Sequence, residues 1–215
     1  MRGAAHIRTV MFDIGGVLVN SRPDPTRIAS ILGLDPRSRT CVDLLDHSLW
    51  AHREDYDRGM SDRAFWDRVA GDCGLGEITD DVLEALVEED VHRMDQPDPA
   101  ALALVDELRA GGTELAILSN APTCIATKVQ STPWASSRFG AMFFSAPLGV
   151  CKPQRSMYSH ALKQLDVPAT QVAFVDDRKE NLRAAELLGI TPILWDDARN
   201  VRDTFIAEGL LLATA

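Results

Sequence analysis

The feature that most constrains this chain is a regular alternation of apolar runs and amphipathic stretches in its C-terminal half. After about residue 113, each of four short apolar runs is followed by a stretch whose apolar residues recur at helical spacing. This alternation is typical of a parallel β-sheet with helices on its faces. The runs are apolar throughout, as expected of strands buried on both sides. We therefore predict an α/β fold with a three-layer, doubly wound parallel sheet and strands at 114–120, 141–145, 171–177 and 191–195.

The N-terminal part of the chain has a different texture. Residues 7–14 (IRTVMFDI) predict one more buried strand, which ends at the pair Gly15-Gly16. Between about 23 and 94 the apolar residues recur every three or four positions, with Asp, Ser or Thr at several segment starts and Gly at several ends. We therefore predict an all-helical insert after the first strand, with residues 1–20 and 95–215 forming the core and residues 21–94 forming the insert.

Charge and cysteine content narrow the choice of partners. The chain has 22 basic and 32 acidic residues, a formal net charge of −10, and no cluster of Lys and Arg, which argues against nucleic acid and anionic membranes. No apolar run approaches the ~20 residues that span a bilayer. The four cysteines form no C-x-x-C pair, which favours free thiols in a reducing compartment. We expect a cytoplasmic monomer or homodimer whose partner is a small molecule.

Polar side chains follow the predicted strands where a parallel sheet binds its ligands. Asp13, Ser119-Asn120 and Asp176-Asp177 stand at strand ends, and Lys152 precedes a predicted helix. Each alone has an ordinary role, as a helix cap, a turn residue or a surface cation. Together they would meet beyond the carboxyl ends of one sheet. Carboxylates suit Mg²⁺, a hydroxyl and an ammonium suit phosphoryl oxygens, and a carboxylate can attack phosphorus. The set predicts Mg²⁺-dependent phosphoryl transfer.

The order of these motifs resembles the haloacid dehalogenase (HAD) superfamily over nearly the whole chain. The matching segments are MFDIGGVL, LAILSN, GVCKP and VAFVDDRKENLRAAELLG. The resemblance implies a Rossmann-like core, and it identifies the helical insert as the mobile cap of the family, here of the small helical type. The segment EDYDRGMSDRAFWDRVA is similar to caps in the branch that contains the epoxide-hydrolase phosphatase domain and sugar-1-phosphatases.

The resemblance also implies a role for each motif residue. Asp13 would be the nucleophile and form an aspartyl-phosphate. Ser119 and Lys152 would bind the phosphoryl oxygens and assist catalysis, and Asn120 would add an amide donor to the substrate. Mg²⁺ would be held by Asp13, by the backbone carbonyl of Gly15, and by Asp176 and Asp177, with Asp177 as the first choice for direct contact within that pair.

Gly15 departs from the pattern of the family. Phosphatases of the superfamily usually carry a second Asp at this position, which protonates the leaving group and activates the attacking water. A general acid/base of this kind contributes ~10²–10⁴-fold in rate. We favour a phosphatase of a small phosphorylated metabolite, such as a sugar phosphate. Either its leaving group needs little protonation, or a cap residue replaces the missing Asp; His47, His52, Asp55 and Tyr56 are the candidates.

Two other functions are compatible with a glycine at position 15. A weak or inactive relative would bind a phosphorylated metabolite or another partner without turnover, and every other motif residue would still be retained. A 2-haloacid dehalogenase would also lack the second Asp, because its leaving group is a halide. Such enzymes need no metal, and the pair Asp176-Asp177 argues against this function.

Overall fold

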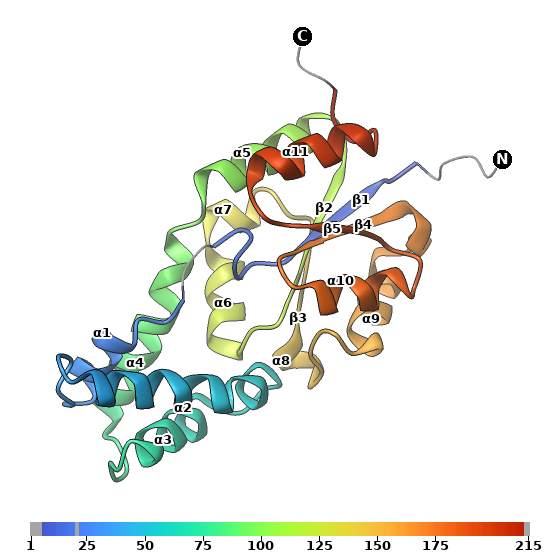
Figure 1. Ribbon diagram of the computed structural model, residues 1–215. Helices are drawn as coiled ribbons and strands as arrows, with labels where there is room; N and C mark the ends of the chain where they lie inside the picture. The colour runs from blue at the N-terminus through green and yellow to red at the C-terminus, as the bar shows by residue number, and fades with distance from the viewer. Residues whose placement is uncertain (1–5, 20–21, 213–215) are drawn as a thin grey trace.

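The core of the molecule is a parallel five-stranded sheet. The computed structural model describes residues 6–19 and 22–212 (Figure 1). Within them the strand order is β3-β2-β1-β4-β5, with every neighbouring pair parallel. The chain moves outward from β1 on one side and then crosses over to β4, which makes the sheet doubly wound, as predicted. The strands are β1 (Thr9–Phe12), β2 (Glu114–Ser119), β3 (Ala141–Phe144), β4 (Val172–Asp176) and β5 (Thr191–Leu194).

Helices connect the strands and cover both faces of the sheet (Figure 1). Local signals start several of them; for example, the Asp98 side chain accepts hydrogen bonds from two backbone N–H groups at the start of α5, and Pro99 occupies the first helical position. The helices of the core are α5 (Pro99–Ala110), α6 (Thr123–Ser131), α7 (Pro133–Ser136), α8 (Ser145–Leu148), α9 (Arg155–Leu165), α10 (Lys179–Glu186) and α11 (Ala198–Ala207), with a 3-10 turn at η2 (Ala169–Gln171).

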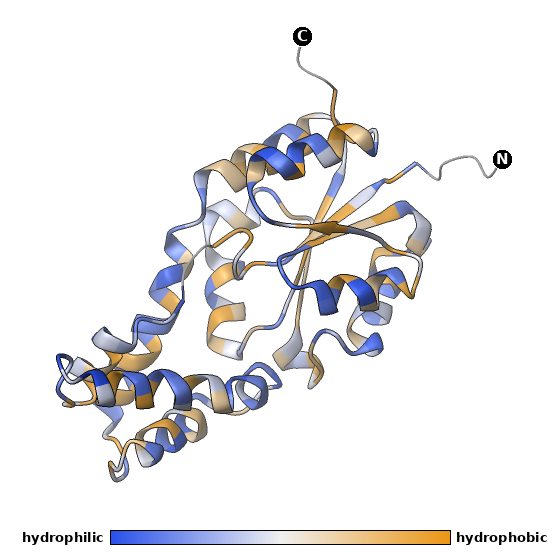
Figure 2. Ribbon diagram, in the orientation of Figure 1, coloured by the Kyte–Doolittle hydropathy of each residue, from blue (hydrophilic) through white to orange (hydrophobic). Residues whose placement is uncertain are grey.

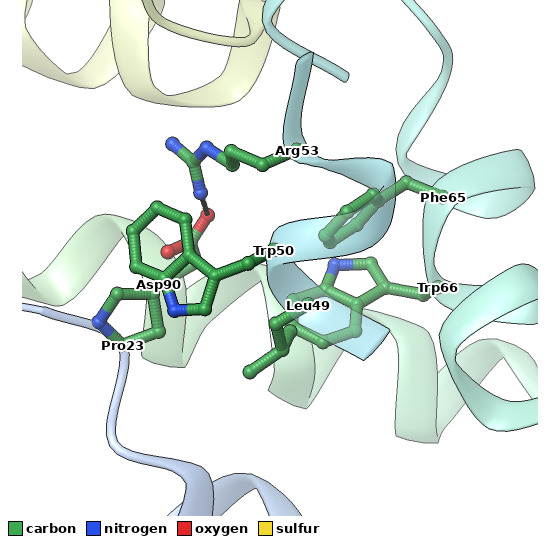
Figure 3. Close-up of a pocket in the computed structure, with 7 residues that line it drawn as sticks. All are labelled: Pro23, Leu49, Trp50, Arg53, Phe65, Trp66 and Asp90. Atoms are coloured by element: carbon green, nitrogen blue, oxygen red, sulfur yellow. Dashed lines mark hydrogen bonds and ion pairs between the residues drawn. The ribbon is translucent and has the colours of Figure 1, made fainter. Parts of the chain in front are cut away.

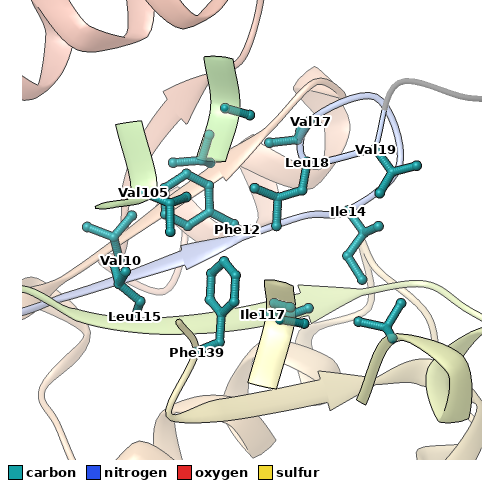
Figure 4. Close-up of a cluster of buried hydrophobic side chains, with 14 of the residues drawn as sticks. Val10, Phe12, Ile14, Val17, Leu18, Val19, Val105, Leu115, Ile117 and Phe139 are labelled. Carbon is teal, nitrogen blue, oxygen red and sulfur yellow. The ribbon is translucent and has the colours of Figure 1, made fainter. Parts of the chain in front are cut away.

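Two hydrophobic clusters lie on the opposite faces of the sheet. Val10 and Phe12 belong to one cluster and Met11 to the other, because successive side chains of a strand point to opposite faces. Figure 4 shows the first cluster, where Phe12 lies among residues of β2, α5 and the segment after β1. The strands are the most apolar part of the core, and the outer faces of the helices are largely hydrophilic (Figure 2).

The segment between β1 and α5 folds as four helices with a hydrophobic cluster of their own. They are α1 (Pro25–Ile31), α2 (Arg39–Asp57), α3 (Asp62–Asp72) and α4 (Asp80–His92), followed by η1 (Arg93–Asp95). Tyr56, Phe65 and Trp66 are fully buried in this cluster, with the rings of Tyr56 and Phe65 stacked at 3.9 Å. We call α1–α4 the helical subdomain. The division into a core and a cap stays a prediction, and its boundary at residues 20 and 21 lies outside the described residues.

The structure differs from the sequence-based expectation mainly in short elements. The first strand is β1 alone, so Asp13 stands just past its end rather than inside it. The helices α7 and α8, of four residues each, were not expected, because one turn is too short to leave a periodic pattern. Among the described residues, no helix combines the length and apolar character that crossing a membrane requires.

Candidate active site

Asp13 lies at the centre of the predicted site, directly after β1. Its side chain is buried, and one carboxylate oxygen, Oδ1, receives three donors. These are the Ile14 backbone N–H at 2.7 Å, the Ser119 hydroxyl at 2.7 Å and the Lys152 ammonium at 3.0 Å. The other oxygen, Oδ2, accepts no hydrogen bond from the described residues. One oxygen therefore fixes the carboxylate, and the other is available to a metal or to phosphorus.

Lys152 joins the nucleophile position to the end of β4. Its side chain is only 1% exposed, and its Nζ also lies 2.7 Å from Asp176 Oδ2. Burial acts to lower the pKa of Lys152, but the carboxylates of Asp13 and Asp176 outweigh burial and raise that pKa. The ammonium therefore stays charged, and it offsets the repulsion between two buried acids.

Asp176 is fully buried and is held on both carboxylate oxygens. The Arg178 backbone N–H donates to Oδ1 at 2.8 Å, and the Asn181 amide donates to both oxygens at 3.0 and 3.1 Å. Burial raises the pKa of Asp176 to about 6, although Lys152 acts in the opposite direction. Asn181 thus orients this acid, as its place in the fourth motif suggests.

Asp177 is the exposed member of the acidic pair, and it makes no hydrogen bond or ion pair to another described residue. Its side chain lies against Gly16, where an added Cβ would come within 2.5 Å of Asp177 Oδ2. Asp13, Asp176 and Asp177 each offer an oxygen within 4.8 Å of the others. Three clustered carboxylates, one of them unengaged and seated over a glycine, fit the hard-oxygen ligand set that Mg²⁺ prefers.

Asn120 does not present a free amide to a substrate. Its Nδ2 donates to the Lys152 carbonyl at 3.0 Å, and its Oδ1 accepts from the Lys152 backbone N–H at 2.7 Å. The side chain is therefore committed to the loop that carries Lys152. The expectation that Asn120 is a substrate donor gives way to a positioning role, which sequence alone could not reveal because the pairing joins segments 32 residues apart.

Gly15 is exposed, and its surroundings are open. An added Cβ there would meet no atom within 4 Å, and its φ lies outside the left-handed range. Its carbonyl accepts no hydrogen bond from the described residues and is free to serve as a metal ligand. Neither space nor backbone strain therefore excludes an Asp at this position.

The four candidate replacements for the missing acid point elsewhere or are already engaged. His52 pairs with Asp72 at 2.8 Å, His47 is exposed, and Asp55 is exposed and pairs with Arg68. Tyr56 donates to Asp62 at 2.7 Å, and burial raises its pKa far above neutrality. Three of the four are therefore engaged with residues of α3, and His47 lies at the surface.

A mostly apolar pocket lies in the helical subdomain. It is lined by Pro23, Leu49, Trp50, Arg53, Phe65, Trp66 and Asp90 (Figure 3), and these side chains leave too little space for a water molecule. Arg53 and Asp90 point toward one another at its polar end, 3.5 Å apart. The Trp66 indole N–H is buried and has no hydrogen-bond partner within the described part of the chain, which leaves one donor at the apolar wall.

Comparison with known proteins shows the family of the chain. The model of haloacid dehalogenase-like hydrolases matches residues 7–189. The chain belongs to this family of hydrolases. A sesquiterpene phosphatase of Aspergillus oryzae is 31% identical over 103 residues, which is 48% of this chain and 53% of the relative. A drimenol cyclase of Aspergillus calidoustus is 23% identical over 193 residues, which is 88% of this chain and 34% of the relative. The chain thus spans about half or less of these curated relatives.

Solved structures share the fold of this HAD-like hydrolase. A HAD-like family hydrolase of Porphyromonas gingivalis has a TM-score of 0.69 at 22% identity, covering 94% of this chain and 98% of that one. A HAD family enzyme of Bacteroides thetaiotaomicron in complex with magnesium and inorganic phosphate has a TM-score of 0.66 at 17% identity, covering 87% and 93%. An L-2-haloacid dehalogenase of Xanthobacter autotrophicus has a TM-score of 0.62 at 18% identity, covering 94% and 83%. These identities show a common fold and leave the activity open.

Proposed function

We propose that this hydrolase is a Mg²⁺-dependent phosphatase of a small phosphorylated metabolite. The observation that carries the proposal is that the two carboxylate oxygens of Asp13 have different surroundings. One oxygen of this carboxylate is fixed by three donors and the other is free, within reach of two further carboxylates. The magnesium and phosphate bound by a structural relative support the same chemistry.

Each residue has a definite task in this proposal. Asp13 Oδ2 attacks phosphorus, and the Ser119 hydroxyl and the Lys152 ammonium hold phosphoryl oxygens. Asp13, Asp177 and the Gly15 carbonyl would contact Mg²⁺ directly, and Asp176 would complete the site while it anchors Lys152. A bound Mg²⁺ supplies stabilisation of the negative charge that develops on the phosphoryl group. Lys152 and the Ser119 hydroxyl act on the same charge from the opposite side.

The acidic cluster favours a phosphatase over a dehalogenase. Displacement of a halide needs no metal ion. Lys152 offsets the repulsion between Asp13 and Asp176, but the third carboxylate, Asp177, has no cationic partner among the described residues, and a bound Mg²⁺ would supply one. Burial raises the pKa of Asp177, and the charge of Asp13 raises it further. A protein that binds phosphorylated metabolites without turnover is the second alternative, because it would keep the same binding residues.

The pocket in Figure 3 bears on the organic part of the substrate. Its walls are mainly aromatic and aliphatic, and the side chains would have to move apart to admit an apolar group, which they suit better than a sugar ring. The partial match to a sesquiterpene phosphatase supports the same direction. Apolar phosphate esters therefore belong beside sugar phosphates among the proposed substrates. All four cysteines are free thiols, which supports the proposed cytoplasmic location; a monomer or homodimer stays a prediction.

A substrate panel tests the function. Acetyl phosphate, p-nitrophenyl phosphate, sugar 1- and 6-phosphates, geranyl and farnesyl phosphates and 2-chloropropionate are compared with Mg²⁺ and with EDTA. We expect Mg²⁺-dependent release of phosphate, reduced by roughly 10⁴-fold or more in Asp13→Asn. The matched control Asp55→Asn, which removes an exposed carboxylate away from the site, should keep the wild-type rate.

Three results would decide against the proposal. Release of chloride without Mg²⁺ would favour the dehalogenase. Equal phosphate release by the wild type and Asp13→Asn would show that Asp13 is not the nucleophile. The absence of turnover together with thermal stabilisation by phosphate and Mg²⁺ would favour the binding protein.

A further inference from the structure

No residue described so far accounts for proton transfer to the leaving group. One buried acid of the helical subdomain lies close enough to the site for the charge of Asp13 to act on it. Asp57 is the last residue of α2, and its side chain is 12% exposed. Arg53 Nε donates to Asp57 Oδ1 at 2.9 Å, and Asp57 Oδ2 has no hydrogen bond to the described residues. Resting on the proposed phosphatase function, we propose that Asp57 is the general acid and base that replaces the carboxyl missing at Gly15.

A chain of hydrogen bonds places Asp57 beside the catalytic edge of the sheet. The Asp57 carbonyl accepts from the Ser145 hydroxyl, whose oxygen accepts from the Ala121 backbone N–H at 2.9 Å. Ala121 lies two residues after Ser119, which donates to Asp13. The end of α2 is thereby fixed to the same strand end that positions the nucleophile.

The loop after Asp57 also contacts the core closely. Gly59 has a φ of +106°, and an added Cβ would lie 2.9 Å from the Ala146 carbonyl. Only a glycine permits this approach of the backbone. The contact keeps the C-terminal end of α2 against α8, next to the loop that carries Lys152.

The surroundings of Asp57 suit an acid that gains and loses a proton near neutrality. Burial raises the pKa of Asp57 to about 6, against the opposing effect of Arg53; the charges of Asp90 and Asp13 add to the rise. Burial raises the pKa of the Cys151 thiol, and the charge of Asp57 raises it further. Because Asp57 is at the C-terminal end of a 19-residue helix, the helix dipole also disfavours its anion.

Arg53 does not neutralise Asp57 alone, because it is shared. Its guanidinium reaches Asp57 on its own helix and Asp90 on α4; Figure 3 shows the contact with Asp90. Asp90 also pairs with Arg93 at 2.6 Å. Arg53 therefore fixes one oxygen of Asp57 without forming a bidentate pair. The second oxygen is left for the leaving group.

The proposed proton transfers balance over two half-reactions. In the first, Asp13 Oδ2 forms a bond to phosphorus, the bond from phosphorus to the ester oxygen breaks, and protonated Asp57 gives its proton to that oxygen. In the second, the Asp57 carboxylate takes a proton from water, and the water oxygen attacks phosphorus. The bond from phosphorus to Asp13 Oδ2 then breaks, which releases inorganic phosphate and restores the Asp13 carboxylate, and Asp57 is again protonated.

The test is a leaving-group series measured with Asp57→Asn, a substitution that keeps the size and an acceptor for Arg53. We expect kcat/KM for alkyl phosphates to fall by ~10²–10⁴-fold, while kcat/KM for p-nitrophenyl phosphate changes less than about threefold. With p-nitrophenyl phosphate the variant should also show a burst, because the aspartyl-phosphate loses the base that activates water.

Rescue and pH give two further readouts. Gly15→Asp in the Asp57→Asn background should restore most of the activity on alkyl phosphates, because Gly15 has room for the added side chain. Asp55→Asn is the matched control and should leave the leaving-group dependence unchanged. In the wild-type enzyme, the ratio of alkyl to aryl kcat/KM should fall as the pH rises above about 6, and this readout needs no variant.

An equal loss for all leaving groups in Asp57→Asn, with no burst and no rescue, would assign Asp57 a structural role and overturn this inference. Wild-type and Asp55→Asn enzymes would still depend on Asp13 in that case. Turnover that does not depend on Asp13 would overturn the proposed function, and this inference with it.

Discussion

Two parts of the site obtain their geometry in different ways. Asp13 Oδ1, Lys152 and Asp176 are held by partners that all belong to the core: the strand ends, their connecting loops and Asn181 of α10. Around Gly15 the site is open, and the acid that we propose for proton transfer, Asp57, comes from α2 of the helical subdomain. The phosphate-binding half is fixed within the core, whereas the proton-transfer half needs two subdomains in contact.

This difference has a physical basis. Metal and phosphate binding require charges at fixed distances, so a rigid, fully bonded arrangement serves them best. Proton transfer to a leaving group must be adjusted to each substrate. Because Asp57 belongs to the helical subdomain, its position can change together with the adjacent pocket, which is lined by its partner Arg53.

The largest effect should follow from breaking the rigid half. Lys152→Met removes the ammonium between two buried carboxylates and leaves them to repel each other. We expect the free energy of unfolding at pH 7 to fall by ~3–5 kcal/mol and turnover to fall by about 10²-fold or more. Chemical denaturation and phosphate release measure the two effects. An unchanged unfolding free energy would contradict the claim that Lys152 holds the two acids together.

The two adjacent glycines provide a smaller and sharper comparison. Gly16 has a φ of +76°, and its Cβ would collide with Asp177, whereas Gly15 has open space. We expect Gly16→Ala to cost ~1–2 kcal/mol of unfolding free energy and to weaken Mg²⁺ binding, because Asp177 must move. The matched variant Gly15→Ala should leave both quantities nearly unchanged. Calorimetric titration with Mg²⁺ and chemical denaturation separate the two positions; equal effects would refute the assignment of Gly16 as the seat of Asp177.

The last comparison concerns the proton-transfer half of the site and its dependence on pH. The pKa of Asp57 is about 6 in the folded protein, above its ordinary value of 3.8, so the folded state binds this proton more tightly than the unfolded state. Its contribution to stability is therefore present below about pH 4 and is lost as the pH rises through 6.

Relative to Asp57→Asn, the wild type should lose about 2 kcal/mol of unfolding free energy between pH 4 and pH 7. Denaturation of both proteins at each pH measures the difference, and the contributions of all other groups cancel. A difference that grows in favour of the wild type as the pH rises would mean that Arg53 outweighs burial at Asp57.

The sequence predicted the architecture well wherever its signal was local or repeated. The strands at 114–120, 141–145, 171–177 and 191–195 correspond to β2, β3, β4 and β5, because continuous apolar runs report burial on both faces. The one-turn helices α7 and α8 were missed, because they are shorter than any pattern. The failure to predict α8 mattered, because α8 begins with Ser145, which fixes the end of α2.

By itself, the sequence determined that Asp13, Ser119, Lys152, Asp176 and Asp177 would meet, because strand ends of one parallel sheet share an edge. Only the tertiary structure decided what each partner does. It turned Asn120 toward the Lys152 backbone, seated Asp177 on Gly16, and buried Asp57 while it left Asp55 exposed. The choice between two acids two residues apart depends on the rotation of α2 about its axis. Packing against a distant part of the chain sets that rotation, and no local pattern records it.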